Sequence, residues 1–443
     1  MNNQLLVALS LGIVLLSGCN QPKKITPVSI KKIYMNRTLD TVTLRSDRTA
    51  STQAASYFYK SGDVIGEKRL GNGDVMITSM NDNRMVMYRM FNLFNVQNVF
   101  STDNAFAALK YDGTVISWGY EYYGEWAYGP HFFTNIKAIY SNDYAFVGVK
   151  FDGSVVTWGV SEFGGDRNSY VPGLDHVKTV YSTREAFAAL KSDGSVITWG
   201  NKEKGGDNSV VIKELINVKA IYSTDSAFAA LKTDGSVITW GNKEKGGDNS
   251  VVIKELINVK AIYSTDSAFA ALKTDGSVIT WGNKEKGGYS GKFSEELINI
   301  DKIHSSKYAF TALRNDGAAI YWGDFGDDMI VPEYDSRTIK DIYSTRSAFA
   351  GITADGSVIT WGDKKTGGDS VKVEKKLIGV TNIYSTDSTF AALKTDGSVI
   401  FWGYTRDGSE VSKELTDIKE IYPRNYDFLG IKSDGSVVES LLR

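Results

Sequence analysis

The sequence predicts an all-β protein built from tandem repeats of about 41 residues. Nine Asp-Gly pairs follow one template at intervals of 38 to 41 residues, and residues 201–241 are identical to residues 242–282. Within a repeat, apolar and polar residues alternate with the period of two that is typical of β-strands. The pairs fall at 112–113, 152–153, 193–194, 234–235, 275–276, 316–317, 355–356, 396–397 and 434–435.

Each repeat is predicted to contain three strands. In residues 201–241 these are 218–222, 227–232 and 236–240, the last rich in β-branched residues and tryptophan. The turn-forming run 223–226 separates the first two strands. Asp234-Gly235 joins the other two and predicts a two-residue type I′ hairpin with positive φ at both residues. The segment 208–215 is compatible with an outer strand or with a single helical turn capped by Ser209.

Two aromatic positions recur through the array and are predicted to form the core between units. A sugar-binding ladder is the alternative, but ordering 41 residues costs about 40–80 kcal/mol of backbone entropy. Burying large side chains between neighbouring units offsets that cost at about 1.5–3 kcal/mol each. The residues are Phe106, Phe146, Phe187, Phe228, Phe269, Phe310, Phe349, Phe390 and Phe428, with Trp118, Trp158, Trp199, Trp240, Trp281, Trp322, Trp361 and Trp402.

The two ends of the array depart from the template. Residues 31–94 are predicted to be one or two degenerate units that form an N-terminal cap, followed by the repeat array at 95–443. The last unit lacks the Trp-Gly pair, so we expect the cap to supply a strand to it. This expectation favours a closed or nearly closed ring over the alternative, an open superhelical array.

The repeats resemble those of the regulator of chromosome condensation (RCC1) family. The resemblance lies in the Ala-Leu-x-x-Asp-Gly-x-Val hairpin followed by Trp-Gly and a Gly-rich loop, and it covers residues 95–443. It implies a β-propeller of RCC1-like blades. The family's Gly-x-x-His is replaced here by Thr224-Asp225-Ser226-Ala227, so its nucleotide-exchange and chromatin-binding activities are not carried over.

The N-terminus predicts a lipid anchor. Residues 5–16 form a short apolar run that ends in Leu16-Ser17-Gly18-Cys19, which resembles a bacterial lipobox. We expect residues 1–18 to be a lipoprotein signal peptide, Cys19 to be acylated, and residues 19–30 to be a tether of roughly 20 Å. The predicted location is the bacterial cell envelope, at the outer membrane if the cell is Gram-negative.

Composition and motifs argue against several functions. The formal net charge of −2 excludes the basic footprint of a nucleic-acid binder. No cofactor or metal site is predicted, since the three histidines lack ligand spacing and no catalytic motif occurs. The third residue of the turn after each first strand changes sign freely, which indicates a solvated face and not a cation site. These residues are Asp103, Asp143, Arg184, Asp225, Asp266, Lys307, Arg346, Asp387 and Asn425.

Two loops break the repeat and are the candidate contact regions, at residues 120–133 and 324–328. The first contains Tyr122, Tyr123, Trp126 and Tyr128, which are candidate contacts for a partner or a glycan because Tyr and Trp are enriched at binding hot spots. Packing of these aromatics against the cap is the alternative. The sequence therefore favours a non-enzymatic envelope lipoprotein that binds an unknown protein partner. Glycan binding, or an enzyme acting on polysaccharide, are the other possibilities.

Overall fold

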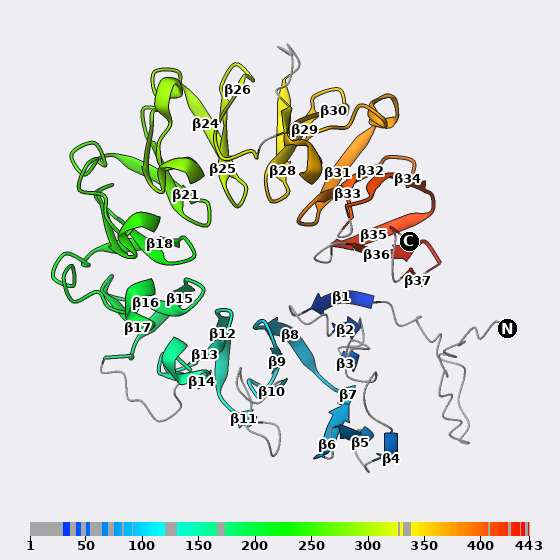
Figure 1. The fold of residues 1–443 in the computed structure, drawn as a ribbon. Helices are drawn as coiled ribbons and strands as arrows, with labels where there is room; N and C mark the ends of the chain where they lie inside the picture. The colour runs from blue at the N-terminus through cyan, green and yellow to red at the C-terminus, as the bar shows by residue number, and fades with distance from the viewer. Residues whose placement is uncertain are drawn as a thin grey trace, which may run out of the picture.

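The computed structural model describes residues 30–35, 41–45, 50–53, 64–69, 75–81, 84–90, 92–119, 131–165, 173–326, 328–330, 338–405, 408–423, 427–434, 436–438 and 442. The predicted fold class is confirmed: the protein is an all-β repeat propeller. Each of the nine repeats forms its own antiparallel sheet of three or four strands, and the sheets follow one another around a ring in chain order (Figure 1).

The first strand of each repeat lies on the inside of the ring, where it contacts the first strands of the neighbouring sheets. These inner strands are β8 (Val96–Ser101), β12 (Ile136–Ser141), β15 (Val177–Ser182), β18 (Val218–Ser223), β21 (Val259–Ser264), β24 (Ile300–Ser305), β28 (Ile339–Ser344), β31 (Val380–Ser385) and β35 (Ile418–Pro423).

The second and third strands extend each sheet outward. The second strands are β9 (Ala105–Lys110), β13 (Ala145–Lys150), β16 (Ala186–Lys191), β19 (Ala227–Lys232), β22 (Ala268–Lys273), β25 (Ala309–Arg314), β29 (Ala348–Thr353), β32 (Thr389–Lys394) and β36 (Phe428–Lys432). The third strands are β10 (Val115–Gly119), β14 (Val155–Gly159), β17 (Val196–Gly200), β20 (Val237–Gly241), β23 (Val278–Gly282), β26 (Ala319–Gly323), β30 (Val358–Asp363), β33 (Val399–Tyr404) and β37 (Val437–Val438).

The segment between the third strand and the next repeat takes more than one form. Three sheets gain a fourth, outer strand: β11 (His131–Phe133), β27 (Met329–Ile330) and β34 (Glu410–Leu415). Helical turns follow several third strands, namely η2 (Ser161–Phe163), η3 (Lys202–Lys204), η4 (Lys243–Lys245), η5 (Lys284–Gly288) and η7 (Lys364–Thr366), and η6 (Gly291–Phe293) and η8 (Glu374–Lys376) come later in their loops. Both predicted alternatives for 208–215 thus occur elsewhere in the array, whereas 208–215 itself forms only turns.

The recurrent aromatics form the core, as predicted. Phe228 pairs with Trp240 across β19 and β20, and their rings stack with centroids 5.2 Å apart. The indole Nε1 of Trp240 donates a hydrogen bond of 3.1 Å to the carbonyl oxygen of Gly205, in the loop of the preceding repeat. Trp199, Trp281, Trp322 and Trp402 make the same bond to the loop that precedes their sheet, so in these five repeats that loop satisfies the buried indole.

The apolar core lies between sheets. Ala227, Ala229 and Leu231 of one sheet pack against Phe269 and Trp281 of the next, and all five are nearly inaccessible to solvent. Small residues on one face and large ones on the other let adjacent sheets approach closely. A single repeat cannot bury its aromatic face alone, so each sheet depends on its neighbour to complete the core.

The hairpin prediction is wrong in detail. Gly235 has φ of +82°, but Asp234 is not among the described residues with positive φ, so the turn is not type I′. Instead, Gly235 N–H donates to the carbonyl of Lys232 at 3.1 Å in a type I turn closed by a glycine bulge. The Asp234 carboxylate accepts hydrogen bonds from the amide and hydroxyl of Ser236, which holds the aspartate at negative φ.

The glycine of this hairpin also serves the next repeat. A Cβ at Gly235 would lie 3.0 Å from the Cα of Asn258, and the carbonyl of Gly235 accepts a 2.9 Å hydrogen bond from Val259. Asn258 has φ of +58°, a conformation that asparagine tolerates better than most residues. The Asp-Gly motif thus builds one sheet and links it to its neighbour.

The N-terminal region contributes two sheets. β1 (Ile30–Met35), β2 (Thr41–Arg45), β3 (Ala50–Gln53) and β7 (Asn92–Leu93) form one, and β4 (Val64–Arg69), β5 (Val75–Asn81) and β6 (Arg84–Met90) form the other. β1 contacts β8, and in Figure 1 its sheet occupies the place in the circle between β8 and the C-terminal sheet.

The expected strand donation is wrong. Among the described residues, the last sheet consists of β35, β36 and β37, all from the C-terminal repeat. The two-residue β37 pairs with β36 through Val437 and Val438 and so takes the third position without an N-terminal strand. The N-terminal strands instead pair with one another, in two sheets of their own.

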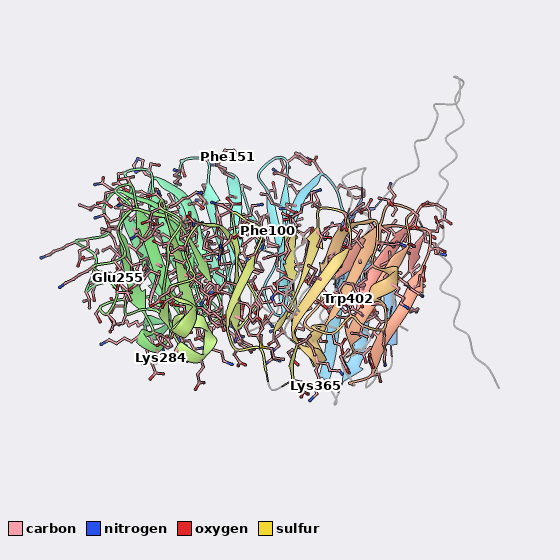
Figure 2. The ribbon with its side chains drawn as sticks, turned by 90° about the horizontal axis from the view of Figure 1, so that it is seen from above. Phe100, Phe151, Glu255, Lys284, Lys365 and Trp402 are labelled. Atoms are coloured by element: carbon pink, nitrogen blue, oxygen red, sulfur yellow. The ribbon has the colours of Figure 1, made fainter. Side chains whose placement is uncertain are left out.

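The ring has two distinct faces. All inner strands run the same way, so the Asp-Gly hairpins and the residues before the inner strands share one face, which we call the hairpin face. The turns after the inner strands and the helical turns η2 to η5 and η7 share the other, the turn face. Figure 2 shows the hairpin residue Phe151 at one face and Lys284 and Lys365 at the opposite face.

Candidate functional site

The same side-chain hydrogen bond holds the turn after each inner strand in the eight repeats whose turn is described. The hydroxyl of Thr224 accepts a 3.0 Å hydrogen bond from the amide of Ala227 and donates one of 3.0 Å to the carbonyl of Lys245. Asn142 and Ser306 make the equivalent bond to the amide three residues on. The second position of the turn is therefore structural, and it is buried in each described repeat where it lines the ring.

Main-chain hydrogen bonds join these turns into a chain around the ring. The amide of Asp225 donates to the carbonyl of Asp266 at 3.0 Å, and the amide of Asp266 donates to that of Lys307 at 2.9 Å. The same bond joins Asp103 to Asp143, Asp143 to Arg184, Arg184 to Asp225 and Arg346 to Asp387. Because only backbone atoms take part, the side chain of the third residue is free to differ from repeat to repeat.

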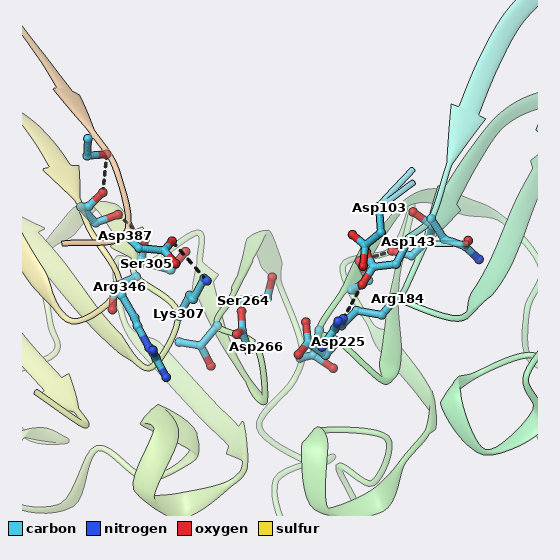
Figure 3. A pocket seen from close by; sticks show the side chains of 18 of the residues that line it. Asp103, Asp143, Arg184, Asp225, Ser264, Asp266, Ser305, Lys307, Arg346 and Asp387 are labelled. Carbon is cyan, nitrogen blue, oxygen red and sulfur yellow. Dashed lines mark hydrogen bonds and ion pairs between the residues drawn. The ribbon is translucent and has the colours of Figure 1, made fainter. Parts of the chain in front are cut away.

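These third residues surround a central cavity of about 1140 Å³, which opens at the turn face. We call the ring formed by the eight described turns the mouth. Its remaining wall comes from Tyr422, Pro423 and Leu429 of the C-terminal repeat. Figure 3 shows the charged side chains of the mouth projecting from successive turns.

Most of the basic groups in the mouth are engaged. Arg184 forms an ion pair of 2.5 Å with Asp143, and Lys307 forms one of 3.4 Å with Asp387 (Figure 3). Arg346 donates a 3.0 Å hydrogen bond to the hydroxyl of Tyr308. The basic groups therefore neutralise two separate stretches of the ring.

Asp225 and Asp266 lie between these stretches and have no ion pair with any described residue. Both are partly buried, and burial raises the pKa of each carboxyl. For Asp266 burial, together with repulsion from Asp225, raises the pKa to about 6 against the attraction of Lys307 and Arg184. The two residues are neighbours because they occupy the same position in the two identical repeats.

The sequence identified the residues of the mouth but not the cavity that they line. The third turn positions do project at one face, as expected, but they line a cavity and are not simply a solvated surface. Within the described residues, no group of three or more His, Cys, Asp or Glu is placed to hold a metal ion. The change of residue type at one position of an otherwise constant turn was the only sequence signal for the mouth.

The other candidate residues have different outcomes. Cys19, Tyr122, Tyr123, Trp126 and Tyr128 lie outside the described residues. In the second irregular loop, Phe325 is buried against Phe349 with ring centroids 6.0 Å apart.

The charges of this second loop are also engaged within the fold. Asp324 pairs with Lys286, and Asp328 pairs with Lys365 at 3.3 Å. The loop 324–328 is thus largely committed to packing and ion pairs between repeats. No helix in the described part of the chain is long and apolar enough to cross a bilayer.

Comparisons with known proteins give matches among solved structures only. No family model and no curated protein matches the sequence. Similar solved structures include the computationally designed protein Ika8, with 12% identity over 77% of this chain and 95% of that chain and a TM-score of 0.32.

Two natural proteins are similar at the same level. The CRINKLY WD40 ectodomain of the Arabidopsis thaliana receptor kinase ACR4 has 16% identity over 63% of this chain and 96% of that chain, with a TM-score of 0.34. Prp20p of Saccharomyces cerevisiae, whose structure was described with its binding to Gsp1p and histones, has 15% identity over 61% and 72%, with a TM-score of 0.34. At these TM-scores no property of those proteins is transferred to this chain.

Proposed function

We propose that the protein is a non-enzymatic, lipid-anchored protein of the bacterial cell envelope whose propeller binds a protein partner at the mouth. The observation that carries the proposal is that different positions of each turn have different roles. The second position and the backbone build the ring, whereas the third position varies in charge around a cavity of about 1140 Å³. A surface with a constant frame and variable side chains suits recognition of a polar protein surface.

The charge pattern of the mouth supports a partner that carries basic side chains. Asp225 and Asp266 have no basic partner among the described residues, and a lysine or arginine of a partner would relieve their mutual repulsion. The paired Arg184 and Lys307 on either side would limit how such a partner is oriented. Charge complementarity of this kind contributes to specificity and to the rate of association.

Site-specific photocrosslinking in cells tests partner binding. A photoreactive residue at position 225 should give a discrete crosslinked adduct, whereas the same residue at position 234, on the hairpin face, should not give that adduct. Asp266→Lys, combined with the probe at 225, should abolish it. Equal adducts from both positions, or none from 225, would contradict binding at the mouth.

The anchor and the absence of catalysis are tested separately. Labelled palmitate should be incorporated into the wild-type chain and not into Cys19→Ala, and the variant should leave the membrane fraction. The purified protein is expected not to turn over envelope polysaccharides. Turnover that is lost on a single substitution would show that the protein is an enzyme.

A further inference from the structure

The hairpin face exposes several large apolar side chains. Phe94, just before the first repeat, is 56% exposed, and Tyr111 and Phe151 in the first two repeats are 46% and 65% exposed. Ile216, Ile257 and Ile298 are 53%, 53% and 51% exposed. Each isoleucine follows a leucine that is fully buried. Since the leucine occupies the core, the isoleucine has no role in the packing between repeats and meets solvent at this face.

These residues share a face because they share a position in the repeat. Ile216 precedes Asn217, whose carbonyl accepts a 2.9 Å hydrogen bond from Thr233 of the Asp-Gly hairpin. Tyr111 and Phe151 occupy the hairpin position of Thr233, and Figure 2 shows Phe151 at this edge of the ring. The aromatic and aliphatic residues therefore form one apolar rim on the hairpin face, extended by Ile378, which is 60% exposed.

A second feature of the same face is an arc of lysines. Lys137, Lys178, Lys219 and Lys260 are the second residues of four consecutive inner strands, next to the bulge near the hairpin end. All four are exposed, and none has an ion pair or hydrogen bond with a described residue. They form a positively charged arc inside the apolar rim.

The hairpins themselves add little net charge to this face. The aspartate of most hairpins is matched by a basic residue two positions earlier, as in the Lys273–Asp275 pair at 3.9 Å and the Lys394–Asp396 pair at 3.7 Å. The four lysines of the arc have no such acidic neighbour two residues on. The arc ends at Asp301, the exposed second residue of β24. Up to that point the face combines an apolar rim with four lysines that lack an acidic partner, which is the pattern that binds interfaces of anionic lipid.

The start of the folded chain lies at this face too. β1 has the bulge between Ile30 and Lys32 that the other inner strands have at the same point, and it contacts β8. By this correspondence β1 begins, at Ile30, on the hairpin face. The tether that follows Cys19 in the proposed function would therefore join the ring on the side that carries the apolar rim and the lysines.

We propose that the hairpin face lies against a membrane surface with anionic headgroups, so that the mouth points away from the bilayer. The biological setting of this orientation rests on the proposed function, since an acyl chain on Cys19 would hold the ring within roughly 20 Å of the bilayer. The lysine arc supplies electrostatic attraction, and the apolar rim contacts the headgroup boundary. A partner at the mouth would then approach from the aqueous side.

The experiment uses the mature chain from residue 19 onward with Cys19→Ser, so that no acyl chain contributes to binding. This chain then lacks cysteine, and a single cysteine at Thr233→Cys (hairpin face) or Lys284→Cys (turn face) carries a fluorophore. Each protein is mixed with vesicles of phosphatidylglycerol and phosphatidylcholine, or of phosphatidylcholine alone, that contain nitroxide lipids. We expect phosphatidylglycerol-dependent binding, with quenching at 233 and not at 284.

A matched pair of charge variants completes the test. Lys137→Gln, Lys178→Gln, Lys219→Gln and Lys260→Gln together should weaken binding to phosphatidylglycerol vesicles by about tenfold or more. The control, Lys202→Gln, Lys204→Gln, Lys243→Gln and Lys245→Gln, removes the same charge from η3 and η4 on the turn face and should bind like the parent. Binding that is absent, quenching at 284 in place of 233, or equal losses in both variants would overturn the proposal. None of these results depends on whether Cys19 is acylated in the cell.

Discussion

Replacing Asp266 by asparagine should stabilise the protein at neutral pH and leave its stability unchanged in acid. Burial and the charge of Asp225 raise the pKa of Asp266 from 3.8 to about 6 in the folded protein. Below pH 3.8 the carboxyl is protonated in the folded and unfolded states, so it costs nothing. Between pH 3.8 and 6 the cost of ionising it in the folded state grows, and above pH 6 the cost is complete.

The size of the gain follows from this pKa difference. A difference of about two pKa units corresponds to about 3 kcal/mol of unfolding free energy if none of it is screened. The carboxyl is only partly buried, so screening by solvent reduces this value. We expect Asp266→Asn to raise the free energy of unfolding by about 1 kcal/mol at pH 8, and by nothing measurable at pH 3.5.

Urea titrations of the wild type and variant at both pH values measure the difference. Asp234→Asn is the control, because this exposed hairpin carboxylate accepts hydrogen bonds from Ser236 that lower its pKa, so the substitution should not stabilise at either pH. Destabilisation by Asp266→Asn at pH 8, or a gain of equal size at pH 3.5, would refute the account of the mouth as a site of unrelieved negative charge.

Three further predictions concern the ring itself. Phe269→Ala should lower the free energy of unfolding by about 3–5 kcal/mol because it empties the core between two repeats. Ile257→Ala on the apolar rim should change it by less than about 0.5 kcal/mol, and chemical denaturation measures both. Gly235→Ala and Gly397→Ala both place alanine at positive φ, which costs about 1–2 kcal/mol of strain. Only the alanine at 235 also meets the backbone of the next repeat, so the melting temperature of Gly235→Ala should fall further. Equal losses in melting temperature would show that the close approach is unimportant. Deleting residues 201–241 removes one whole sheet and should lower the melting temperature sharply in a ring, and a change of only a degree or two would favour an open array.

The organisation of the repeat was predictable from the sequence because it depends on local patterns. Alternation located the three strands, and the recurrence of Phe228 and Trp240 at fixed positions identified the core between units. The hairpin type was not predictable from Asp-Gly alone. The hydrogen bonds from Ser236 hold Asp234 at negative φ, and this local competition outweighed the usual preference of the dipeptide.

The candidate site was only partly predictable. Comparison across repeats singled out the third turn position, but its environment depends on how many turns meet and which charges pair across them. Lys307 pairs with Asp387, two repeats away, and no local pattern indicates that contact. The same holds for the hairpin face, where Ile216 and Phe151 become part of one rim only once the sheets are arranged in a ring.

The sequence by itself determined the repeat length, the strands of each unit and the aromatic core, because each of these is set by residues within about 41 positions of one another. The tertiary structure decided what the repeats jointly build. It has a ring whose N-terminal strands form their own sheets, a mouth in which two aspartates have no ion pair with a described residue, and a face with an apolar rim. The physical reason is that burial and charge pairing are properties of surfaces that meet across repeats. A periodic sequence specifies each surface, but only the arrangement of the sheets around the ring determines which surfaces face a cavity, a neighbour or the solvent.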